Sequence, residues 1–193
     1  MASDKYKIAS QALVLVGHPP IASFDGPSSG SVTANALYED TILELLAVHR
    51  WRFACRAVAL ARLVDAPATQ WEAAYTIPGD VTIIHAVQVD GCDITFARFG
   101  TEVHCDARAS DTVVLIEGYY APEATWPPYF TALAKLKLAS VFAIPVAEDT
   151  DKASLYEGKF IRQLSGAKLV DSQGRSARKL PVGGLRRYHR GKP

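Results

Sequence analysis

The sequence predicts an α+β fold, in which a bundle of about four helices carries an inserted small antiparallel β-sheet and an extended C-terminal tail. Apolar residues recur at helical spacing near both ends of the chain, β-branched residues and turn dipeptides gather in the middle, and no period is sustained after the last helix. We therefore expect a helical bundle domain at residues 1–54 and 126–170, an inserted β domain at 55–125 and a basic tail at 171–193.

The first two helices are predicted from periodicity and from stop signals. Residues 5–16 carry four apolar side chains at helical spacing: Ala9, Ala12, Leu13 and Val16. Gly17 stands where a C′ glycine ends a helix, and the two prolines that follow forbid continuation. The second helix is expected from about Val32 to His49, with Ser29 or Ser31 as its N-cap.

The middle of the chain contains strand and turn signals. Residues 56–63 are ambiguous between strand and helix, and the proline-containing loop after them favours extended chain. Residues 81–89 form a β-branched strand, Asp90-Gly91 is a hairpin signal, Gly100 marks a second turn and residues 111–121 form another strand.

Two further helices are expected after the sheet. One begins at Pro127-Pro128, because proline is favourable in a first helical turn, and Pro145 ends or kinks it. The next is capped by Asp149 or Thr150, and Gly174 closes the ordered part.

Charge is distributed unevenly although the net charge is only +1. Residues 171–193 contain seven Lys/Arg against one acid, Asp171, whereas residues 1–170 contain 14 Lys/Arg and 19 acids. An acidic body with a basic tail indicates a tail that reaches for a partner. The sequence shows no secretory signal pattern and no apolar run that we expect to span a membrane.

The sequence evidence for a catalytic or metal-binding site is weak. His104, Cys105 and Asp106 are consecutive, with Cys92 and His85 on neighbouring predicted strands. Adjacent residues on a strand point to opposite faces, and no CxxC or HExxH spacing occurs, so we expect no metal or cofactor. Cys105 with a histidine stays open as a nucleophile, but no motif supports it.

Two other patterns are interpreted as structural. The glycines between residues 17 and 30 match neither a dinucleotide fingerprint nor a P-loop, so a phosphate site is not expected there. Trp51, Phe53 and Trp71 could stack on bases, but aromatic residues at a junction between helix and sheet more often close a core.

The tail is the strongest functional feature. Its cations could bind phosphates, but the apolar residues among them favour a protein surface on which the tail folds. The residues expected at that interface are Arg175, Arg178, Lys179, Leu180, Leu185, Arg186, Arg187, Tyr188 and Arg190.

A set of motifs links the chain to a known family. A leucine-rich first helix runs into GHPPIASFDG, a second helix ends in HRWRFA, and a Trp-x-x-x-Tyr-x-x-Pro-x-Asp segment follows. The matching residues are Gly17, Pro19, Pro20, Ile21, Ser23, Phe24, Asp25, Gly26, Trp51, Phe53, Trp71, Tyr75, Pro78 and Asp80. Through these motifs the sequence resembles, over about residues 8–160, the tail tubular protein A, or head-to-tail adaptor, family of short-tailed bacteriophages. A Gly-Ser-rich insertion after Asp25-Gly26 and the strongly basic tail depart from the family pattern.

The resemblance implies a structural virion protein of the phage neck rather than an enzyme, assembled in the host cytoplasm. Such adaptors form a ring of twelve subunits between the portal protein and the tail nozzle protein, and DNA passes through the ring without specific binding. An acidic body suits such a channel, because every phosphate that Lys or Arg neutralises adds affinity for DNA. The alternative is a small nucleic-acid-binding protein that uses the basic arm.

Overall fold

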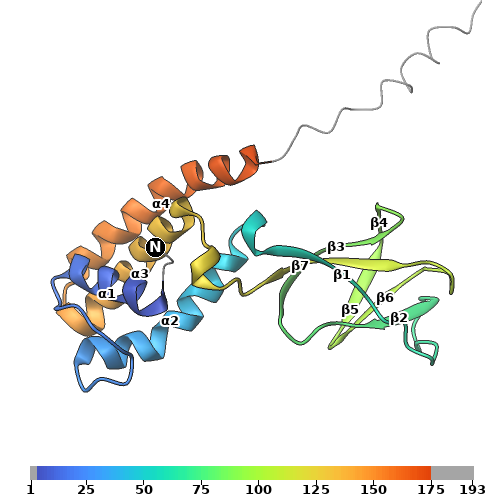
Figure 1. The fold of residues 1–193 in the computed structure, drawn as a ribbon, viewed down its shortest axis with the longest axis horizontal. Coiled ribbons are helices and arrows are strands. Elements are labelled where there is room, and N and C mark those ends of the chain that lie inside the picture. The colour runs from blue at the N-terminus through green and yellow to red at the C-terminus, as the bar shows by residue number, and fades with distance from the viewer. Residues whose placement is uncertain (1–3, 175–193) are drawn as a thin grey trace, which may run out of the picture.

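The structure is a computed structural model that describes residues 4–174, and it consists of two lobes (Figure 1). The helical lobe contains α1 (Lys5–Val16), α2 (Ser29–Ala47), α3 (Pro128–Ala147) and α4 (Thr150–Gln173). The β lobe contains β1 (Cys55–Ala59), β2 (Ala73–Thr76), β3 (Val81–Val89), β4 (Cys92–Ile94), β5 (Phe96–Phe99), β6 (Glu102–Cys105) and β7 (Val113–Tyr119). Single 3₁₀ turns, Arg52–Ala54 and Glu123–Thr125, stand at the two crossings between the lobes. The expected α+β class is confirmed.

Helix α3 is the centre of the helical lobe and packs against the other three helices. Its buried side chains include Phe130, Leu133, Leu138 and Phe142. By length and composition this helix could span a membrane, contrary to the expectation from the sequence. Half of its most apolar stretch is buried in the structure, in contact with the neighbouring helices. A helix at the centre of a helical core has such an apolar composition because most of its sides are covered.

The connection between α1 and α2 is fixed at both ends. Gly17 has a φ of +93°, and its N–H and that of His18 bond to the last carbonyls of α1, as in a glycine C-cap. Phe24 is buried between Tyr6 and Tyr38, so this connection is pinned to the core. The N-cap of α2 is Ser28, whose hydroxyl accepts the N–H of Ser31, rather than Ser29 or Ser31.

The expected small antiparallel sheet is present as two sheets, with strand orders β1-β7-β3-β4 and β2-β6-β5. They are linked because the chain after β1 passes from one to the other: Leu60 N–H bonds to Val113, and Leu63 N–H bonds to Ala74. The chain also changes sheet between β2 and β3, between β4 and β5, and between β6 and β7. The core between the sheets contains Tyr75, Val87, Val103, Cys105 and Leu115.

Both turns predicted in the β lobe occur. Asp90 (φ 52°) and Gly91 (φ 74°) are left-handed, as in the type I′ turn of a two-residue hairpin, and they join β3 to β4. Gly100 (φ 58°) lies in the turn between β5 and β6.

Two predictions about the C-terminal half need adjustment. Of the two outcomes expected at Pro145, an end or a kink, the end does not occur at that residue, since α3 continues to Ala147. Helix α4 continues to Gln173, beyond the boundary expected at residue 170. Asp171 therefore belongs to a helix and not to the tail. The tail residues expected to contact a partner lie outside the described residues: Arg175, Arg178, Lys179, Leu180, Leu185, Arg186, Arg187, Tyr188 and Arg190.

Candidate functional site

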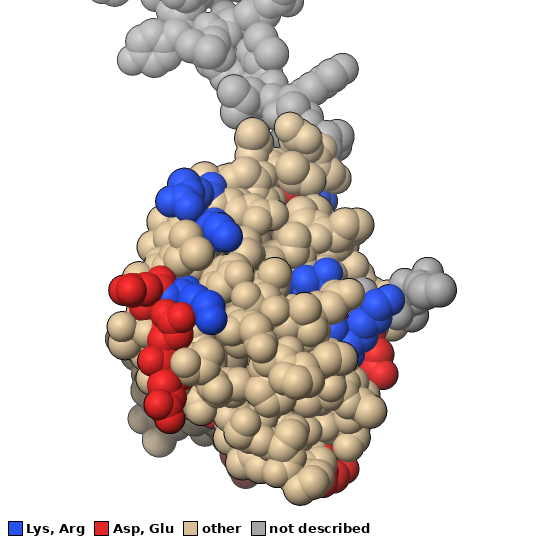
Figure 2. All heavy atoms as spheres, turned by 90° about the vertical axis from the view of Figure 1, so that its left-hand side faces the viewer, with Lys and Arg blue, Asp and Glu red and all other residues tan. Residues whose placement is uncertain are grey.

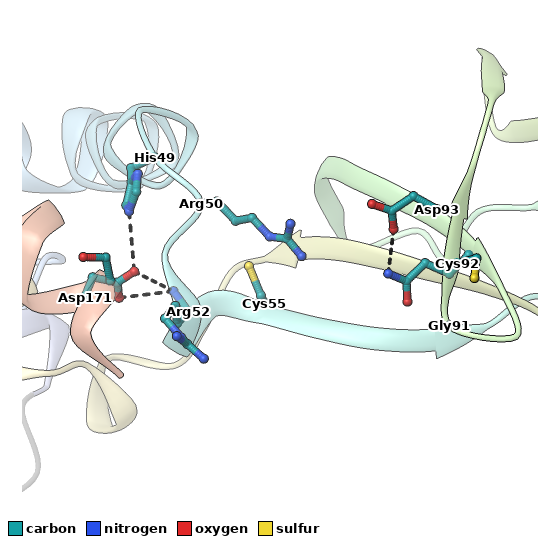
Figure 3. Close-up of a pocket in the computed structure, with 10 residues that line it drawn as sticks. His49, Arg50, Arg52, Cys55, Gly91, Cys92, Asp93 and Asp171 are labelled. Atoms are coloured by element: carbon teal, nitrogen blue, oxygen red, sulfur yellow. Dashed lines mark hydrogen bonds and ion pairs between the residues drawn. The ribbon is translucent and has the colours of Figure 1, made fainter. Parts of the chain in front are cut away.

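An open cleft of about 690 Å³ lies where the two lobes meet, and we call it the junction cleft (Figure 3). One wall is the segment between α2 and β1, the second is the hairpin between β3 and β4, and the third is the end of α4. Its lining residues are His49, Arg50, Arg52, Cys55, Gln88, Gly91, Cys92, Asp93, Asp171 and Ser172. The last described residue, Gly174, lies close to Arg52 of this cleft.

Asp171 ties the end of α4 to the junction. Its side chain is 1% exposed. The carboxylate accepts the backbone N–H of Arg52 at 3.2 and 3.3 Å and the hydroxyl of Tyr129 at 2.6 Å. His49 Nε2 lies 3.5 Å from the same carboxylate (Figure 3). Three parts of the chain, α3, α4 and the segment between α2 and β1, therefore meet at one buried group.

The backbone of the junction is held by Trp51. Its indole is 1% exposed, its N–H donates to the carbonyl of Leu45 at 2.9 Å, and its ring packs edge-on against Phe130. Phe53 packs on the same phenylalanine. The backbone that carries Arg50 and Arg52, on either side of Trp51, is therefore held in place by these contacts.

Arg50 and Arg52 are exposed at the wall of the cleft, and neither forms an ion pair with another residue in the range 4–174. The Arg50 side chain extends from the junction toward the hairpin that carries Asp93 (Figure 3). A Cβ at Gly174 would lie 3.9 Å from Cζ of Arg52, so this guanidinium adjoins the end of α4.

The titratable groups near the cleft respond to these cations. Burial lowers the pKa of His85, and the positive charge of Arg50 lowers it further. Burial raises the pKa of the Cys55 thiol, while Arg50 opposes that rise. Asp93, at the other end of the cleft, accepts a hydrogen bond of 2.7 Å from the amide of Gln88.

A buried ion pair lies in the β lobe near the junction. Glu117 is fully buried and accepts from Arg56 Nε at 2.7 Å, and the same guanidinium bonds to Asp80 at 2.6 Å and covers the ring of Tyr119. Asp80 is therefore the second carboxylate that pairs with Arg56. The hydrogen bond from Arg56 lowers the pKa of the Asp80 carboxyl.

The motif residues quoted for the resemblance lie in three places rather than at one site. Gly17, Pro19, Pro20, Ile21, Asp25 and Gly26 shape the connection between α1 and α2, and Trp51 and Phe53 lie at the junction. Tyr75 is buried between the sheets, whereas Trp71 and Pro78 are half-buried on the β lobe. These positions fix backbone geometry and packing.

Two residues considered above for metal binding or nucleophilic chemistry, His104 and Cys105, have structural roles in the β lobe. His104 bonds to Thr69 and Glu102 and stacks on Phe99, while Cys105 is buried between the sheets. Within residues 4–174 no three His, Cys, Asp or Glu side chains are grouped so that they could hold a metal ion.

Sequence reasoning missed the junction cleft and the role of Asp171. A signal for the latter was present, because Phe160, Leu164, Ala167 and Asp171 follow helical spacing, so that the carboxylate continues the apolar face of α4. An acid at such a position needs buried donors. The cleft itself has no local signal, because its three walls come from distant segments.

Comparisons with models of known protein families and with curated protein sequences find no match to this chain.

Proposed function

We propose that this protein is a structural adaptor of a phage virion, which joins the portal to the tail nozzle as one subunit of a ring. The proposal rests on the motifs described above and on the resemblance that they carry. It makes the chain a scaffold whose surfaces bind other proteins, and it assigns no reaction to it.

The observation that carries most weight is the structural position of the motif residues. The motif GHPPIASFDG contains no recognisable catalytic residues. Its residues determine how α1 and α2 are connected. Gly17 needs its positive φ, and Ile21 donates its N–H to Ser10 of α1 at 3.1 Å. These residues fix a particular arrangement of two helices. The resemblance therefore favours a fold in common with the adaptor family rather than a reaction in common.

The surface of the helical lobe offers room for neighbouring subunits. Viewed from its end, the lobe has broad uncharged areas between a few groups of Lys and Arg, with Asp and Glu toward the edges (Figure 2). Large apolar side chains are exposed on all four of its helices: Val14, Leu15, Val32, Leu43, Ile144, Leu155, Ile161, Leu169 and Val170. Exposed apolar side chains in such number are typical of proteins that bury surface on assembly.

The basic tail supplies the contact with the portal on this proposal. It carries seven Lys/Arg with apolar residues between them, as a segment that folds onto a partner requires.

The test is co-purification with the portal protein encoded in the same phage genome. Full-length protein is expected to be retained by immobilised portal, and a chain truncated after Gly174 is expected to be lost. This truncation point keeps all of α4 and its Asp171 contacts, so the variant remains folded. Equal retention of both chains would refute the role of the tail, and no retention of either would refute the adaptor function.

A second candidate is a nucleic-acid-binding protein that uses the same tail. Arg50 and Arg52 favour it, because they add two cations beside the start of the tail. It predicts tight DNA binding that weakens steeply as salt rises. The adaptor proposal predicts weak binding at physiological salt.

A further inference from the structure

We propose that the junction cleft binds an acidic segment of a partner protein, whose carboxylates pair with Arg50 and Arg52. The inference does not depend on the adaptor proposal, because it follows from the geometry and charge of the described residues.

The first step is that the two arginines are exposed cations on a rigid support. They flank Trp51, which is buried and hydrogen-bonded, and the N–H of Arg52 is fixed by Asp171. Neither guanidinium has a carboxylate within ion-pair distance among residues 4–174. A fixed backbone lowers the entropy lost when a ligand orders these side chains.

The second step concerns the chemistry of the ligand. A guanidinium is a planar fork that matches carboxylate or phosphate oxygens in pairs. The two acids in the lining are already engaged: Asp171 by Arg52, Tyr129 and His49, and Asp93 by Gln88. An anion near the arginines therefore displaces no carboxylate of the described residues.

The third step distinguishes an acidic protein segment from nucleic acid. A volume of about 690 Å³ between three walls suits a short stretch of peptide and not a duplex, which needs an extended basic surface. The cleft is basic at the junction end and carries Asp93 at the hairpin end. A chain with a phosphate at every nucleotide would meet Asp93, whereas a peptide can place its acids at the arginine end alone.

The experiment is an NMR titration of the full ¹⁵N-labelled chain with a short synthetic peptide in which Glu alternates with Ala. We expect saturable shifts of the backbone signals of Gln88, Gly91 and Cys92 and of the Nε–Hε signals of Arg50 and Arg52. The double variant Arg50→Glu with Arg52→Glu is expected to weaken binding at these signals about tenfold or more. The matched control, Arg108→Glu with Arg162→Glu, reverses two exposed arginines outside the cleft and is expected to change the affinity less than about twofold.

Three results would overturn the proposal. A peptide with Gln in place of Glu could bind equally well, the shifts could be confined to residues 175–193, or a DNA oligonucleotide of equal charge could move the cleft signals at lower concentration. The titration of the unaltered chain decides among these outcomes even if the double variant fails to fold. Because portal is absent, a failure here leaves the co-purification result unaffected.

Discussion

Replacement of Asp171 by alanine is the most informative perturbation of the junction. The side chain is 1% exposed and accepts both the N–H of Arg52 and the hydroxyl of Tyr129. Its removal leaves two partly buried donors without their acceptor, at about 1–3 kcal/mol each, so we expect a loss of about 2–5 kcal/mol in the free energy of unfolding. Asp171→Asn keeps one acceptor oxygen and is expected to cost about 1–2 kcal/mol.

The assay is urea denaturation followed by circular dichroism, together with amide hydrogen exchange at Arg52. The control is Ser172→Ala, because this exposed neighbour bonds only within the same turn of α4 and its loss should lie within about 0.5 kcal/mol of zero. In a double-mutant cycle, Tyr129→Phe should cost less in the Asp171→Ala background than alone. A change below about 0.5 kcal/mol for Asp171→Ala, with unchanged exchange at Arg52, would show that α4 does not hold the junction.

The remaining predictions concern alkaline pH, packing and thiols. The pKa values of Tyr38 and Tyr120 are raised, chiefly by burial, so the folded state keeps their protons while the unfolded state loses them; stability should fall as pH rises above about 10, and a flat urea midpoint there would contradict this. Gly118→Val should lower the thermal midpoint by several degrees, because a Cβ there would lie 2.7 Å from Ile83; an unchanged midpoint would show that the two strands separate easily. A maleimide should label Cys92 rapidly and Cys105 only on unfolding, since Cys92 is exposed and Cys105 is buried with a raised pKa; rapid labelling of Cys105 would reveal local opening.

The parts of the fold that follow local rules could be predicted from sequence. Gly17 ends α1, Asp90-Gly91 forms the hairpin, and prolines precede α3, because each depends on a few neighbouring residues. The hidden role of Asp171 depends on Arg52, from which it is separated by 119 positions in the sequence. Its place on the apolar face of α4 could have shown that it is buried but not which group it binds.

The division of the β lobe into two sheets was also beyond sequence reasoning. Alternation of apolar and polar residues predicts strands, but it does not show that Leu60 pairs with one sheet and Leu63 with the other. The junction cleft has the same character, since Arg50, Gln88 and Ser172 become neighbours only when both lobes and α4 are assembled. The basic tail could be recognised from composition alone, and the structure adds that Gly174, the residue before it, lies beside Arg52.

The central proposal is tested most directly by electron microscopy of the protein mixed with the portal protein from its own genome. The adaptor account predicts a ring of subunits on one face of the portal, with the basic tail in contact with it. Absence of added density on the portal, at concentrations at which both proteins are folded, would contradict the account.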